Sequence, residues 1–188
     1  LTKLVRLQQI MVGIIKTADG SIERIPTGKI GILKELLEDL CPHNKVIVWS
    51  NFVDTYRDIR DLCDSLKLGS VEIVGEQSDG SKQTEDERQD AIDRFNNDPD
   101  IHVAVASQQA GGVGIGLQAA SYMIYYSKSF DLEHDLQSES RNHRAGCEHH
   151  EKITRIDIIT EGTTDEKITE ALRRKENFGE FLLTLQEA

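Results

Sequence analysis

The segment QSESRNHRAG brings together polar side chains that suit a phosphate group: Gln137, Arg141 and Arg144. They stand at positions i, i+4 and i+7, so on a helix they project from one face. Each guanidinium offers a planar fork of donors, and two of them beside an amide form a good phosphate receptor. A surface helix whose arginines pair with acidic neighbours such as Glu139 and Glu148 fits the spacing equally well.

A glycine-rich segment, AGGVGIGL at residues 110–117, directly follows an apolar run. Glycine lets the backbone come close to a ligand, and consecutive N–H groups can bind an anion. A purely structural turn is the alternative. The segment is not a Walker A loop, because no Gly-Lys-Ser/Thr follows it. It is not a dinucleotide fingerprint either, because no acidic residue is placed to bind a ribose.

Side chains able to bind zinc cluster near the same place. They are His143, Cys147, His149 and His150. Their spacing matches no usual zinc motif, and the other cysteines, Cys41 and Cys63, are isolated. The favoured interpretation is therefore histidines that face solvent or end a helix, and no metal is expected.

The 188 residues suit a single domain, and 38% hydrophobic residues suffice for a core. The 33 acidic and 22 basic residues give a net charge of −11. This excludes bulk electrostatic attraction to a polyanion, so contacts with a nucleic acid would have to be local. Residues 76–100 hold nine acidic and three basic residues, which is typical of a solvated helix face with its loops.

The cysteines are three in number and form no CxxC pair, which indicates a reducing, intracellular compartment. We expect cytoplasm or nucleoid for a bacterial or phage protein and the nucleus for a eukaryotic one. No run approaches the roughly 20 apolar residues of a membrane span. The apolar run at 10–15 is followed by no signal-peptide cleavage site. The chain opens on Leu1 rather than Met, which suggests a piece of a longer protein.

Helical and strand-like patterns alternate along the chain. The predicted helices cover 3–15, 30–40, 53–66, a segment from the Thr84–Glu87 capping box onward, 132–144 and a segment from Thr163 onward. Asn51 is placed to cap the third helix and Gly69 to end it. The predicted strands cover 45–50, 71–74, 101–107, 121–127 and 153–160. Short strands separated by helices predict an α/β fold with a parallel sheet covered on both faces.

Read in this order, the segments resemble the second RecA-like lobe of superfamily-2 helicases, and more narrowly that of Swi/Snf-related DNA translocases. KVIVWSNF at 45–52 is similar to motif IV, VAVASQQAGGVGIGLQAAS at 103–121 to motif V, and QSESRNHRAG to motif VI. PTGKIGILKELLEDL resembles the helix that enters the lobe. The stretch between motifs IV and V matches the family's pattern at Gly75, Arg88, Ile92, Asp93, Phe95 and Asn96. The resemblance runs from about residue 26 to 175.

The chain departs from the family at Gly116, where Asn is usual, and at Cys147, where Gln is common. Phe130-Asp131-Leu132 stands where a Trp-Asn-Pro sequence is usual. These departures affect the expected DNA contacts more than the ATP chemistry, and they suggest a divergent member, bacterial or from a phage.

The resemblance implies a RecA-like three-layer sandwich, with a mostly parallel sheet and helices on both faces. We expect residues 1–25 to form an N-terminal helix and connecting segment, and residues 26–188 to form the helicase C-terminal domain. Within this family, lobe 1 makes most of the contacts that bind ATP and Mg²⁺. The motifs for that binding are missing from this chain, so the isolated piece is expected to be inactive and monomeric.

The resemblance also implies roles for single residues. Arg144, and secondarily Arg141, would act as arginine fingers on the γ-phosphoryl group, and Gln137 would couple the phosphate to lobe closure. The other residues expected at the nucleotide are Gly112 and Gly114. Those expected to contact DNA phosphates are Asn51, Ser107, Gln108, Ala110 and Gly111.

The sequence thus predicts one lobe of an ATP-dependent DNA translocase or helicase, whose partners are duplex DNA and its own lobe 1, with no membrane involved. Three alternatives stay open. The first is a binding or regulatory module of the same fold that hydrolyses nothing. The second is a conventional helicase acting on single-stranded DNA or RNA. The third is a small zinc-stabilised nucleic-acid module.

Overall fold

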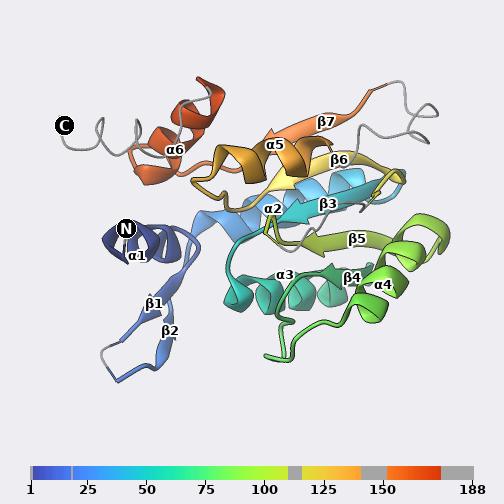
Figure 1. Ribbon diagram of the computed structural model, residues 1–188, viewed down its shortest axis with the longest axis horizontal. Coiled ribbons are helices and arrows are strands. Elements are labelled where there is room, and N and C mark those ends of the chain that lie inside the picture. Colours follow the sequence, from blue (N-terminus) through green and yellow to red (C-terminus); the bar gives the residue numbers. More distant parts are fainter. Residues whose placement is uncertain (1, 18, 110–115, 141–151, 175–188) are drawn as a thin grey trace.

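A parallel sheet of five strands forms the centre of the molecule (Figure 1). The computed structural model describes residues 2–17, 19–109, 116–140 and 152–174. The strands are β3 (Lys45–Trp49), β4 (Gly69–Ile73), β5 (Ile101–Ala106), β6 (Ala120–Tyr125) and β7 (Thr154–Asp157). Their order across the sheet is β4-β5-β3-β6-β7, and every pairing is parallel. The predicted α/β fold with a parallel sheet is confirmed.

Strand β3 shows why apolar runs form the middle of this sheet. Its successive side chains point to opposite faces, and both faces are covered. Val46 and Val48 lie in the core on one face, while Ile47 and Trp49 lie in the core on the other. A run without polar alternation is therefore what a central strand of this sheet requires.

Helices cover both faces and complete the three layers. On one face, α2 (Gly28–Leu40) and α3 (Val53–Ser65) contribute Leu33, Leu37, Ile59 and Cys63 to the core. On the other face, α4 (Glu85–Asn97) packs through Ala91, Ile92 and Phe95. Helix α5 (Leu132–Ser140) lies beside β6 on that side, where Ser138 Oγ is 2.9 Å from Tyr125 Oη.

The N-terminal helix α1 (Thr2–Met11) is shorter than the predicted 3–15. Gly13 turns the chain with a φ of +84°, and a Cβ there would lie 2.7 Å from the carbonyl oxygen of Ile25. Residues 14 and 15, expected in the helix, belong instead to β1 (Ile14–Lys16), which pairs antiparallel with β2 (Ile22–Arg24). A tertiary contact at Gly13 thus overrides the helical pattern.

The two ends of the described chain pack against each other. Leu4 on α1 joins a small core with Ile168, Ala171 and Leu172 on α6 (Thr164–Arg173). The division of the chain at residue 25 stays a prediction. Within the parts of the chain that the structure describes, no helix is both long and apolar enough to cross a membrane.

Helix ends were predicted with mixed success. The Thr84–Glu87 capping box forms, and Thr163 caps α6. Asn51 does not cap α3: Phe52 takes the N-cap position, without a side-chain cap, and the Asn51 amide bonds elsewhere. Nor does Gly69 end α3. Lys67 adopts the positive φ of 58° after the helix, and Gly69 begins β4.

Candidate nucleotide and nucleic-acid interface

The carboxyl ends of the parallel strands meet at one edge of the sheet, which is where α/β folds place their ligand sites. Asn51 follows β3, Ser107 and Gln108 follow β5, and Ser127 and Ser129 follow β6. These residues are spread over almost 80 positions of the sequence, from Asn51 to Ser129, and the parallel order of the strands places all of them at one edge of the sheet.

Gln108 is the centre of this edge. Its side chain is fully buried. Its Oε1 accepts from Asn51 Nδ2 at 3.2 Å and from the backbone N–H of Ser129 at 2.7 Å. Its Nε2 donates to Ser138 Oγ at 3.2 Å and, at the longer distance of 3.4 Å, to Asp135 Oδ1. The amide therefore joins the loops after β3 and β6 to helix α5.

Buried hydroxyl groups join the loops after β3 and β6 a second time. Ser50 Oγ lies 2.6 Å from Thr55 Oγ1 and 2.9 Å from Ser127 Oγ. Ser127 Oγ also accepts from the backbone N–H of Asn51 at 3.0 Å. These bonds hold the backbone of Asn51 against the end of β6.

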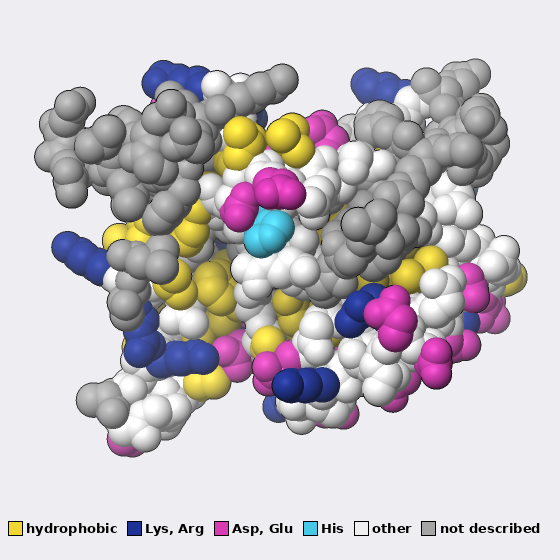
Figure 2. Space-filling model, viewed as in Figure 1, with side chains coloured by type: hydrophobic (Ala, Val, Ile, Leu, Met, Phe, Trp, Pro, Cys, Tyr) yellow, Lys and Arg dark blue, Asp and Glu magenta, His cyan; other side chains and the backbone are white. Residues whose placement is uncertain are grey.

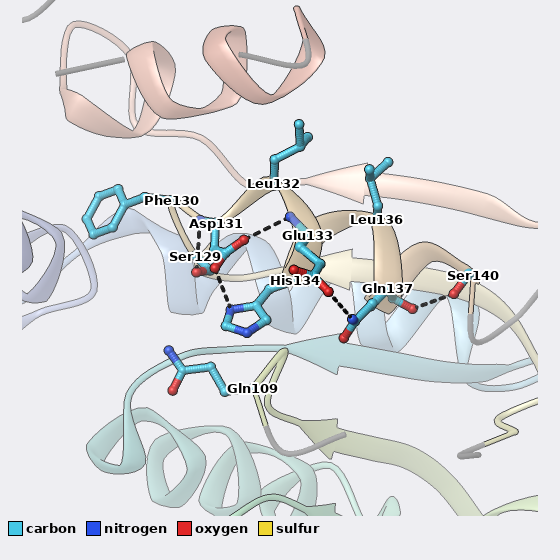
Figure 3. A pocket seen from close by; sticks show the side chains of 10 residues that line it. All are labelled: Gln109, Ser129, Phe130, Asp131, Leu132, Glu133, His134, Leu136, Gln137 and Ser140. Carbon is cyan, nitrogen blue, oxygen red and sulfur yellow. Dashed lines mark hydrogen bonds and ion pairs between the residues drawn. The ribbon is translucent and has the colours of Figure 1, made fainter. Parts of the chain in front are cut away.

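Helix α5 lines a hollow of about 970 Å³ beside this edge. The helix begins after Asp131, whose Oδ1 accepts from the Glu133 N–H at 2.8 Å. Gln137 is exposed and donates to Glu133 Oε1 at 3.1 Å. In Figure 3, Leu132 and Leu136 point away from Gln109, whereas His134 and Gln137 point toward the side where Gln109 lies. The hollow thus has polar side chains toward the loop after β5, while Phe130, Leu132 and Leu136 make much of the rest of its lining apolar.

An ionic cluster holds α5 to the far edge of the sheet. Arg155 on β7 donates to both carboxylate oxygens of Asp135, and its Nε donates to Asp157 Oδ1 at 3.1 Å. Its guanidinium carbon lies 4.1 Å from the centre of the Tyr125 ring. Lys128 Nζ lies 2.8 Å from Asp157 Oδ2. These ion pairs, in which positive and negative side chains alternate, therefore connect β7, the loop after β6 and α5.

The charges of this cluster shift one another's titration. Burial alone would raise the pKa of Asp157, but the Lys128 ammonium and the Arg155 guanidinium outweigh it and hold that pKa below its usual value. Burial lowers the pKa of Lys128, although Asp157 opposes this. Burial of the Tyr125 hydroxyl raises its pKa.

Four of the predicted site residues lie in the described chain: Asn51, Ser107, Gln108 and Gln137. Asn51 and Gln108 are in direct contact, and Ser107 Oγ accepts from the Gln109 N–H at 3.2 Å. Gln137 stands on the outer face of α5 and shares no bond with the other three. The predicted residues outside the described chain are Arg141, Arg144, Gly112, Gly114, Ala110 and Gly111.

The zinc candidates His143, Cys147, His149 and His150 also lie outside the described residues. Where side chains are described, no group of three or more His, Cys, Asp or Glu is placed to hold a metal ion.

The acidic side chains of α4 gather at the lower right of Figure 2, so negative charge is concentrated over that helix.

Sequence reasoning missed Ser129, Asp135 and Arg155. The signal for Arg155 was present, because Arg155 and Asp157 interrupt the apolar run ITRIDIIT at alternate positions and so share one face of the strand. Asp135 and Ser138 carried a weaker signal: they are polar residues three apart on a helix that must bury one face.

Asn96, singled out by the pattern before motif V, supports the start of β6. Its Nδ2 donates to the carbonyl oxygen of Gly116 at 2.9 Å, and its Oδ1 accepts from the N–H of Ala119 at 3.2 Å. The residue therefore holds the segment that leads into β6, and its role is structural in the described chain.

Comparison with known proteins agrees with this architecture. Residues 28–146 match the family described as helicase conserved C-terminal domain. The chain is 36% identical over 150 residues to the ATP-dependent helicase fft2 of Schizosaccharomyces pombe, covering 79% of this chain and 11% of that protein. The chain therefore spans about a tenth of the length of this curated relative.

Solved structures show the same similarity. The C-terminal part of the Fun30 ATPase domain aligns with a TM-score of 0.68 and 29% identity, over 77% of this chain and 44% of that one. The SWI2/SNF2 ATPase C-terminal domain of Sulfolobus solfataricus aligns with a TM-score of 0.65 and 26% identity, over 93% of this chain and 68% of that one.

Proposed function

The chain belongs to the helicase conserved C-terminal domain family, in its Swi/Snf-related branch, and we propose that it is the second motor lobe of a longer ATP-dependent DNA translocase. The observation that carries this proposal is the edge centred on Gln108. There the loops after β3 and β5, which supply the expected nucleic-acid contacts, are bonded to the helix that carries Gln137.

For the nucleic acid, we propose phosphate contacts from Asn51 and Ser107 and from the backbone at Ala110 and Gly111. Such contacts need hydroxyl, amide and N–H donors rather than a basic patch, and they are independent of base sequence. They are thus compatible with a net charge of −11. Gln108 was expected to contact DNA as well. Its amide is buried and engaged by four partners, so a supporting role suits it better.

For ATP and Mg²⁺, the described residues fit half a site. The hollow beside α5 offers the Gln137 amide, but Asp131 and Glu133 line it as well, and no lysine or arginine does so in the described chain. Carboxylates repel a triphosphate. The cations must therefore come from Arg141 and Arg144 and from a second lobe that binds the nucleotide.

Within this half-site, Arg144 and secondarily Arg141 would neutralise the charge that develops on the γ-phosphoryl oxygens. Gly112 and Gly114 would let the backbone approach the nucleotide, and Gln137 would sense it from α5. When bound, ATP would supply the phosphoryl group and Mg²⁺ would neutralise negative charge on its phosphates. Closing and opening of the two lobes in each cycle would then move the protein along its track.

We propose that the lobe acts inside the cell, on duplex DNA and against the N-terminal lobe of its own chain, and that the isolated lobe is a monomer. Named relatives that are ATP-dependent helicases support the use of ATP. The choice of duplex over single strands follows the Swi/Snf-related similarity.

The test is steady-state ATP hydrolysis by the full-length parent protein with no nucleic acid, duplex DNA, single-stranded DNA or RNA. Strong stimulation by duplex DNA supports the proposal. Arg144→Ala should lower the stimulated rate by about 10³-fold or more. Arg94→Ala, an exposed arginine near the far end of α4, is the matched control and should leave the rate unchanged.

Other outcomes point to the alternatives. Stimulation only by single strands or by RNA would keep the fold and replace the translocase with a conventional helicase. No hydrolysis under any condition would favour a binding or regulatory module. Full activity in Arg144→Ala would refute the arginine-finger assignment.

A further inference from the structure

The amide of Gln108 has every hydrogen-bonding position filled. An amide oxygen can accept two hydrogen bonds and its NH₂ group can donate two. In this structure the oxygen accepts from Asn51 and Ser129, and the nitrogen donates to Ser138 and Asp135. The side chain is fully buried, so water cannot replace any of these partners.

The partners lie on three segments that are far apart in the sequence. Asn51 follows β3, Ser129 follows β6, and Asp135 and Ser138 lie on α5. When a buried amide loses one hydrogen-bond partner, its N–H or C=O group stays buried without a bond, and the desolvation cost of that group is no longer compensated. The position of Asn51 relative to α5 is therefore set through Gln108, and a shift of one favours a shift of the other.

The α5 end of this chain of contacts is rigid. Asp135 receives Arg155 on both oxygens, and Ser138 Oγ is also bonded to the Tyr125 hydroxyl and to the Asp135 carbonyl. If the Gln108 side chain shifts while it keeps its bonds to Asp135 and Ser138, helix α5 thus has to shift with it as a unit. Gln137 adjoins Ser138 on that helix and would move with it.

We propose that Gln108 is a positioning residue that transmits nucleic-acid contact at Asn51 and Ser107 to α5, and so sets the place of Gln137 at the nucleotide. This inference rests on the function proposed above. Gln108 touches neither nucleic acid nor nucleotide. It changes the rate of hydrolysis when DNA is bound, and because it holds Asn51 it also affects the affinity for DNA, while the affinity for ATP stays unchanged.

The test compares the full-length parent protein with its Gln108→Met variant, which keeps the length of the side chain and removes its hydrogen bonds. Gln89→Met, at an exposed position on α4, is the matched control. The kcat with saturating duplex DNA should fall about fivefold or more in Gln108→Met, the lower end of typical coupling between sites. The basal rate and the KM for ATP should change less than about twofold, and the Kd for duplex DNA should rise by no more than it does in Asn51→Ala.

Several outcomes overturn the inference. Unchanged stimulation in Gln108→Met removes the coupling role. A loss of DNA affinity larger than that of Asn51→Ala indicates a direct contact instead. An equal fall of the basal and stimulated rates indicates a purely structural role. If the parent protein is stimulated by no nucleic acid at all, the proposed function fails first and the inference falls with it.

A second measurement needs no variant, in case Gln108→Met does not fold. Hydrogen–deuterium exchange of the parent protein should show altered amide exchange in residues 132–140 when duplex DNA is added without nucleotide, because the contacts of the helix with its surroundings change when it shifts. Unchanged exchange there, with protection elsewhere proving that DNA is bound, would overturn the inference while leaving the proposed function intact.

Discussion

Arg155 and Asp135 form a bidentate ion pair between the edge strand β7 and helix α5. Nη1 donates to Oδ2 at 3.1 Å and Nη2 to Oδ1 at 2.9 Å. The Asp135 side chain is 6% exposed and the Arg155 side chain 23%. Removing such charges from water offsets most of their attraction, so the pair orients α5 more than it stabilises the domain. Helix α5 carries Gln137, and this pair, together with Gln108, positions that helix.

Breaking this pair should be costly. Arg155→Met leaves the Asp135 carboxylate buried without its partner, and we expect the free energy of unfolding to fall by about 3–5 kcal/mol. Arg174→Met, which removes an exposed pair with Glu170, should cost less than about 1 kcal/mol. Urea denaturation of both variants measures the difference. Equal effects would show that the buried pair does not fix α5.

Two glycine-to-alanine substitutions should change stability in opposite directions. A Cβ on Gly69 would lie 2.1 Å from the carbonyl oxygen of Asp100, so Gly69→Ala must displace backbone. We expect a loss of more than about 2 kcal/mol. Nothing lies within 4 Å of a Cβ on Gly31, inside α2. Gly31→Ala should add roughly 0.5–1 kcal/mol. Thermal denaturation tests both, and a stabilising Gly69→Ala would contradict the close approach of β4 to the turn before β5.

Asp157 should make the domain sensitive to acid. Its pKa in the folded state lies below its usual value, because Lys128 and Arg155 outweigh the effect of burial. The carboxylate therefore stabilises the fold above the unfolded pKa of about 4, and this contribution is lost as the pH falls through the lower folded value. Urea unfolding at pH 6 and pH 3 should show a smaller loss of stability in Asp157→Asn than in the unsubstituted chain. The exposed control Glu38→Gln should behave like the unsubstituted chain, and an unchanged acid response in Asp157→Asn would contradict the assignment.

Asn51→Ala should weaken binding of the parent protein to duplex DNA by a few-fold, about equally for unrelated base sequences, because a phosphate contact carries no sequence information. Fluorescence anisotropy with two duplexes of different sequence measures this. Asn97→Ala, at the far end of α4, is the control and should bind as before. A loss that differs strongly between the duplexes would indicate base readout.

Much of the fold could be predicted because its signals are local. Apolar runs without alternation mark the strands of a sheet buried on both faces, as Val46 to Trp49 show. The caps at Thr84 and Thr163 need only residues a turn apart. The motifs kept their order and spacing, so the family followed from the residues themselves.

The errors came from contacts between distant segments. Gly13 turns the chain because the backbone at Ile25 lies against it, and no pattern within residues 3–15 records that neighbour. Asn51 is a residue type that often caps helices, and it stands just before α3. Its side-chain amide, however, donates a hydrogen bond to Gln108, which follows β5. Gln108 was expected to contact DNA because of its motif position, and that stays a prediction; its burial against Ser129 and α5 could not be predicted, because only the folded chain brings those segments near.

The order of the sheet has a consequence for the growing polypeptide. Strand β3 occupies the middle of the sheet, and its neighbours β5 and β6 are both synthesised after it. Val46, for example, pairs with Val103 on β5 and with Tyr122 on β6. On a ribosome that adds about 5–20 residues per second, the apolar strand stays without its partners for several seconds. During that interval the KVIVW segment is open to chaperones and to other nascent chains. Only synthesis of β6 supplies the second partner, so the rate at which the ribosome crosses residues 50–125 affects how long the nascent domain is at risk of aggregation.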